Sequence, residues 1–240
     1  MNIQNEIDAI KEKNTSLKSK SRQEKTELYC EGLKAKLEQA SFALSCVEKF
    51  TNLSDDTKST TEEISFSISM QVAFYCDTFW TFLYSSLDVL SQIVNQTMAL
   101  GLKEKDVSFN QIKGKLGGTV HKDLEVSIRY NKCFKSRAFK NLEKYRNCST
   151  HRRQIFIVEL CETKSVRRTA GYPSTATTDS TSIATTDSTS TIVTRTLCDD
   201  PLTQKPKIEK KRIIPQYMVE TQNSIIKSIK EIIKAIEFKR

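Results

Sequence analysis

The chain has 240 residues, which is enough for one domain with a sizeable core, and its formal net charge is +9. This basic balance favours anionic partners such as nucleic acid or an acidic protein. Only two histidines occur, and the seven cysteines form no Cys-x-x-Cys pair, so we expect no metal site and no cofactor. The N-terminal residues lack the apolar core of a secretory signal, which predicts a cytoplasmic protein with reduced thiols.

The first two segments differ in hydrophobic pattern. Residues 1–22 are polar and charged, which predicts a frayed or loosely helical start. From Gln23 to Leu53 apolar residues recur at helical spacing and predict an amphipathic helix. Its apolar face would carry Leu33, Leu37, Ala40, Leu44 and Val47. The polar run 54–63 ends this helix.

The segment from Ile64 to Leu102 has only two charged residues, Asp77 and Asp88, and many aromatic ones. A membrane span is one interpretation of such a stretch. Polar residues interrupt it on all sides, which is atypical of a span and favours a central buried helix. We therefore expect no membrane association.

After this helix the predicted elements become shorter. "GKLGGT" (114–119) lacks the residue order of a phosphate-binding loop and predicts a turn. Residues 120–146 predict two helices, divided near residues 132–136. The β-branched runs 154–161 and 189–197 predict a two-stranded hairpin. Its tip would be the low-complexity, Thr/Ser-rich loop 170–191, which cannot form a core and is predicted to be disordered.

An amphipathic helix is predicted over residues 216–238. Six isoleucines lie on one face of it: Ile225, Ile226, Ile229, Ile232, Ile233 and Ile236. An isoleucine-rich face is typical of intramolecular core, and a helix that docks on a partner is the alternative.

One basic stretch contains the strongest candidate site. Between Arg129 and Arg153 nine basic residues face a single acidic one, Glu143, for a net charge of +8. Within it, Arg146 precedes His151 by five positions. An arginine can donate two hydrogen bonds to phosphate oxygens, and a histidine can carry a proton near neutral pH, so the pair suits phosphodiester chemistry without a metal.

The spacing of this pair raises a geometric question. Residues five apart on a regular helix diverge by about 140°. Cys148, Ser149 and Thr150 are poor helix formers. We therefore expect Arg146 in the last helical turn and His151 in the turn that follows, so that both can reach one phosphate.

The run Arg146-Asn147-Cys148-Ser149-Thr150-His151 resembles the motif of the HEPN superfamily of small helical proteins. That motif is an arginine, usually followed by a polar residue such as asparagine, with a histidine four to six residues later. The resemblance covers about residues 23–151 and implies a mainly α, up-and-down helical bundle. The β-hairpin would be an insertion before the C-terminal helix, within one domain spanning residues 1–240.

The resemblance also implies an activity. Many HEPN proteins are metal-independent endoribonucleases, often toxins or antiviral defence effectors, which leave 2′,3′-cyclic phosphate ends at a site shared by two protomers. Arg146 would then stabilise the phosphorane, His151 would be the general acid or base, and Asn147 would orient them. Lys144, Arg152 and Arg153 are candidate RNA-binding residues, and Asp88 is a candidate acidic partner of Arg146.

The expected partners are RNA, a second copy of the chain and a nucleotidyltransferase-type antitoxin. Two other interpretations stay open. The chain could be a catalytically silent HEPN-like dimerisation module, with Arg146 a surface ion-pair former. It could also bind nucleic acid without chemistry.

Overall fold

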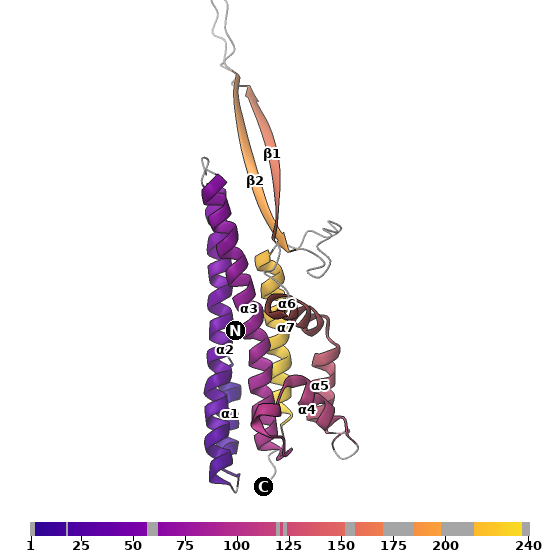
Figure 1. Ribbon diagram of the computed structural model, residues 1–240. Coiled ribbons are helices and arrows are strands. Elements are labelled where there is room, and N and C mark those ends of the chain that lie inside the picture. The colour runs from indigo at the N-terminus through magenta and orange to yellow at the C-terminus, as the bar shows by residue number, and fades with distance from the viewer. Residues whose placement is uncertain are drawn as a thin grey trace, which may run out of the picture.

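Two long antiparallel helices, α2 (Lys20–Asp56) and α3 (Glu62–Thr97), form the framework of the molecule (Figure 1). The computed structural model describes residues 3–17, 19–56, 62–118, 121, 124–151, 157–169, 185–197 and 214–236. The five apolar residues predicted to form the inner face of α2 are all buried, which confirms that helix.

α3 is the central helix of the bundle. Trp80, Leu83 and Leu87 have no exposed surface, and the helix packs against α2, α4, α6 and α7. The prediction of a buried helix is therefore confirmed. Among the described residues, no helix combines the length and apolar character needed to cross a membrane.

The N-terminal residues form a helix, α1 (Gln4–Asn14), where we predicted a frayed or loosely helical start. Ile7 and Ile10 are buried against the core, and α1 contacts both α2 and α7. Glu6 forms an ion pair with Lys230 of α7, with 3.2 Å between Glu6 Oε2 and Lys230 Nζ. A helix of this length is only marginally stable alone in water, so its contacts with α2 and α7 stabilise it. The polar sequence of the segment gave no sign of these contacts.

Between α3 and the candidate site lie three short elements: the 3₁₀ helix η1 (Glu104–Asp106), α4 (Phe109–Leu116) and α5 (Glu125–Lys135). The predicted turn over residues 114–119 was partly wrong, because α4 continues through Gly114 to Leu116. Ser108 caps α4, its side chain accepting a hydrogen bond from the Gln111 amide. Phe109, Ile112 and Leu116 anchor the helix in the core.

α6 (Arg137–His151) follows α5 after the single residue Ser136, which confirms the predicted division into two helices. The Ser136 side chain accepts a hydrogen bond from the Phe139 amide and so caps the start of α6. The prediction that the helix ends soon after Arg146 was wrong: α6 continues to His151.

Two strands and one helix complete the described chain. β1 (Ile157–Thr169) pairs with β2 (Thr185–Leu197) in an antiparallel register that sets Ile157 opposite Leu197 (Figure 1). β2 begins inside the segment 170–191 that we predicted as a loop. The predicted disordered tip falls on residues 170–184, outside the described residues, and stays a prediction.

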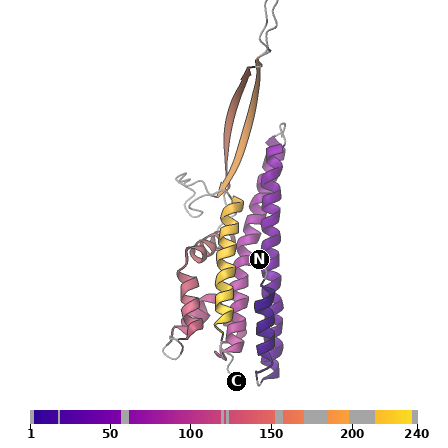
Figure 2. The ribbon, with the colours of Figure 1, turned by 180° about the vertical axis from the view of Figure 1, so that it is seen from behind.

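The C-terminal helix α7 (Ile214–Lys234) is part of the core. Figure 2 shows it (yellow) between the α1–α2 pair and α5. All six isoleucines of its predicted apolar face are buried. The face is therefore intramolecular, and the alternative of a helix docked on a partner is wrong.

Candidate functional site

Arg146 of the candidate motif lies against α3. Its guanidinium carbon is 4.9 Å from the centroid of the Tyr84 ring, an arrangement that favours a cation–π interaction. Its Nη1 donates a hydrogen bond to Asn147 Oδ1 at 3.0 Å. The first two residues of the motif thus contact each other, and the guanidinium has a defined place.

An aromatic cluster fixes the position of α6 on α3. Tyr145 stacks on Trp80 with ring centroids 4.9 Å apart and an interplanar angle of 16°. Tyr217 of α7 contacts both rings, each with a centroid distance of 6.1 Å. Trp80 and Tyr145 are fully buried, so they set the rotation of α6 and with it the direction of the adjacent Arg146.

Asp88 lies one helical turn beyond Tyr84 on α3 and has two identified neighbours. Its Oδ1 accepts a hydrogen bond from the Phe109 amide at 2.9 Å, which caps the first residue of α4. Burial raises the pKa of Asp88, while this hydrogen bond and the charge of Arg146 oppose the shift. Asp88 therefore lies in the electric field of Arg146 and also has a structural role.

Tyr84 is the site residue that the sequence did not reveal. It is largely buried, and burial together with the charges of Asp88 and Glu143 raises its pKa to about 12. Its phenol is therefore neutral at physiological pH, and its ring presents a face to Arg146. No sequence pattern distinguished Tyr84 from its neighbours, because aromatic residues in a buried helix usually belong to the hydrophobic core.

We expect Asp88→Asn to be at least as stable as the wild type at neutral pH. The folded pKa of Asp88 is raised, so its ionised form disfavours the fold above that pKa, and the cost disappears as the pH falls through it. The variant keeps an acceptor for Phe109 and carries no charge. Thermal unfolding across a pH series would show the gain over the wild type shrinking towards acid pH.

The control for this prediction is Asp88→Ala, which removes the acceptor. It should lower the free energy of unfolding by about 1–2 kcal/mol at neutral pH, because the Phe109 amide loses its partner. Equal destabilisation by both variants would contradict the prediction and show that the charge of Asp88, rather than its acceptor, supports the fold.

His151 is the last residue of α6. Along this helix its backbone position is about 140° around the axis from that of Arg146. The two motif residues are therefore not brought to one side of α6, contrary to our expectation. The side chain of His151 and all of Arg152 and Arg153 lie outside the described part of the chain. Lys144 is half-buried on α6.

The comparison with known families gives one match. A model described as HEPN_Cthe2314-like HEPN matches residues 29–193, more than half of the chain. The chain belongs to this HEPN family. No curated protein and no solved structure matches it. The HEPN match includes Tyr84, Asp88, Arg146 and His151, and it leaves α1 and α7 outside.

The charge of the HEPN protein's basic stretch is partly neutralised in three dimensions. Glu231 of α7 pairs with Arg129 at 3.3 Å and with Lys132 at 3.2 Å, and Glu125 pairs with Arg129 at 2.6 Å. The hydrogen bond from Lys132, together with the charges of Lys132 and Arg129, lowers the pKa of Glu231. The net charge of +8 counted along the sequence therefore overstates the charge of the α5 part of the surface.

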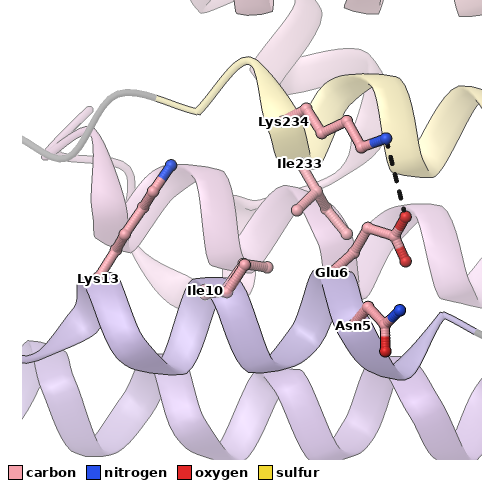
Figure 3. Close-up of a pocket in the computed structure, with 7 residues that line it drawn as sticks. Asn5, Glu6, Ile10, Lys13, Ile233 and Lys234 are labelled. Atoms are coloured by element: carbon pink, nitrogen blue, oxygen red, sulfur yellow. Dashed lines mark ion pairs between the residues drawn. The ribbon is translucent and has the colours of Figure 1, made fainter.

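A cleft of about 360 Å³ between α1 and α7 is separate from the HEPN motif (Figure 3). Ile10 and Ile233 form its apolar wall, while Lys13, Glu6 and Lys234 line its edge. Within the cleft, Glu6 Oε1 and Lys234 Nζ form an ion pair at 4.0 Å. Among the described residues, no group of three or more histidine, cysteine or acidic side chains could hold a metal ion.

Proposed function

We propose that this HEPN protein is a metal-independent endoribonuclease that leaves 2′,3′-cyclic phosphate ends. The observation that carries the proposal is the placement of Arg146, whose guanidinium is held between the Tyr84 ring and Asn147. A charged donor that is already ordered needs little reorganisation when negative charge develops on a phosphate. Arg146 would bind the phosphorane oxygens, and Asn147 would hold the guanidinium.

The chemistry is an internal transfer. The ribose 2′-oxygen attacks the adjacent phosphorus while its proton passes to a base, and the bond to the 5′-oxygen breaks as that oxygen gains a proton. The products are a 2′,3′-cyclic phosphate and a free 5′-hydroxyl. His151 would carry one of these protons, because an imidazole titrates near neutral pH.

The register of α6 supports a composite site in a homodimer. Because Arg146 and His151 lie about 140° apart around the axis, one α6 does not present both to the same phosphate. A two-fold axis beside the motif would bring Arg146 of one protomer towards His151 of its partner. The proposed setting is a cytoplasmic toxin or phage-defence effector, with a nucleotidyltransferase-type antitoxin as its partner.

We expect the purified protein to cleave single-stranded RNA in the presence of a metal chelator. Neither Arg146 nor His151 needs a metal to act on a phosphodiester. Gel electrophoresis would follow the cleavage, and mass spectrometry of the fragments should show cyclic phosphate ends. Equal cleavage by the wild type and by His151→Ala would contradict the proposal, as would activity that requires magnesium.

A catalytically silent HEPN interaction module is the second candidate function. One observation favours it: Arg146 is only partly exposed, and its packing on Tyr84 would have a structural role without any catalysis. This candidate predicts no cleavage under any condition. Arg146→Ala would then lower only the stability of the protein or of its dimer.

A further inference from the structure

α6 has two opposite faces. Phe139, Leu142 and Tyr145 are buried on the inner face. On the other side, the backbone positions of Arg137, Lys140, Lys144 and His151 fall within about 60° of one another around the axis. This second set, which we call the α6 ladder, extends over about 21 Å at the rise of an α-helix.

The ladder differs from the basic residues of α5 in its ion pairing. Arg129 and Lys132 of α5 both pair with Glu231. Arg137 and Lys140 are exposed, and in the described part of the chain neither forms an ion pair with an acidic side chain. Their charges are therefore available to an external anion.

The acidic residue within α6 does not interrupt the ladder. Glu143 lies between the two faces, and its charge contributes to the raised pKa of Tyr84. It is thus close to the α3 side of the helix. The exposed Arg137 and Lys140 and the half-buried Lys144 follow one another along a line of backbone positions that ends, by register, at His151.

We propose that the α6 ladder is the track for the phosphates of single-stranded RNA, with Arg137 and Lys140 as its contacts farthest from the motif. This inference rests on the proposed function, because the track leads a ribose to His151. A single strand can lie along a convex helix face. RNA duplexes are recognised across their wide minor groove through 2′-hydroxyl as well as phosphate contacts, whereas the ladder offers cations for phosphates alone, so a single strand is the substrate class that fits.

The test is the salt dependence of binding to a short, fluorescently labelled RNA whose riboses are 2′-O-methylated. The methyl group blocks attack by the 2′-oxygen, so binding is measured without cleavage. For Arg137→Gln/Lys140→Gln we expect the slope of log affinity against log salt to fall by about 1.4, since each phosphate contact with a single strand contributes about 0.7. Affinity should fall about 25-fold near 0.1 M salt.

The matched control is Arg129→Gln/Lys132→Gln, which removes the same charge from the neighbouring helix. Because the two carboxylates of Glu231 and Glu125 already offset these two positive charges, the slope should stay close to that of the wild type. If both double variants lost the same affinity and slope, RNA binding would depend on the net charge of the protein alone, and the proposed track would be overturned. Circular dichroism would verify that both variants are folded.

Three further outcomes are decisive. Tighter binding of an RNA duplex than of the single strand would overturn the assignment of substrate class. Failure of the wild type to bind the methylated strand would overturn the track itself. A protein that binds along the ladder but never cleaves unmodified RNA would refute the proposed nuclease and leave the track standing.

Discussion

Arg146→Ala is expected to lower the rate of RNA cleavage about 1000-fold, because a preorganised donor to developing negative charge contributes on that order. The guanidinium contacts the Tyr84 ring and Asn147, so its position is defined before a substrate binds. Arg146→Lys keeps the charge but loses the two-donor fork and should recover only part of the rate. Single-turnover cleavage of a labelled RNA would measure these differences.

Tyr84 provides the control for this result. Tyr84→Phe keeps the ring beneath Arg146 and should cleave at close to the wild-type rate. Tyr84→Leu removes the ring, and a displaced guanidinium should lower the rate about 10-fold to 100-fold. If Tyr84 acts through Arg146, the combination Tyr84→Leu/Arg146→Ala should be no slower than Arg146→Ala alone. Additive losses would contradict the positioning role and indicate general damage to the fold.

Trp80→Ala should lower the free energy of unfolding by about 3–5 kcal/mol, the usual range for deleting a large buried aromatic side chain. Trp80 has no exposed surface and stacks on Tyr145, so its loss leaves a cavity between α3 and α6. Because Tyr145 precedes Arg146, the variant should also disorder the candidate site. Urea unfolding followed by circular dichroism would measure the change.

The control for Trp80 is Phe74 on the same helix, whose residue surface is 60% exposed. Phe74→Ala should change the free energy of unfolding by less than about 0.5 kcal/mol. Trp80→Phe keeps an aromatic ring for Tyr145 and should lie between the two. A loss below 1 kcal/mol for Trp80→Ala would refute the view that this residue anchors α6.

The long helices could be predicted from the sequence because each carries a sustained pattern. Val47 and Leu33 of α2, and Ile225 and Ile232 of α7, recur at helical spacing and are buried as expected. A pattern repeated over many turns leaves one packing solution, with the apolar stripe inside. A different signal, a long aromatic segment with only two charged residues, predicted the central position of α3.

Short elements were less predictable because their stability comes from neighbours. The α1 segment was predicted as frayed or loosely helical, and its Ile7 and Ile10 are buried where the helix packs against α2 and α7. The end of α4, residues 114–116, was assigned to a glycine-rich turn because glycine has a low helix propensity. The end of α6 was misjudged for a related reason: intrinsic propensities at Cys148–Thr150 are small energies that the rest of the helix overrides.

The sequence by itself determined the helical class, the long amphipathic elements and the Arg146–His151 spacing through which the chain resembles the HEPN superfamily. These features depend on the spacing of residues that are close together in the sequence, so they can be read without the fold. Tertiary structure decided that Tyr84 lies against Arg146, that Asp88 lies in its electric field, and that Glu231 pairs with Arg129 and Lys132. Those relations join residues from about 58 to 102 positions apart. They arise only when α6 packs on α3 beside Trp80 and α5 packs on α7.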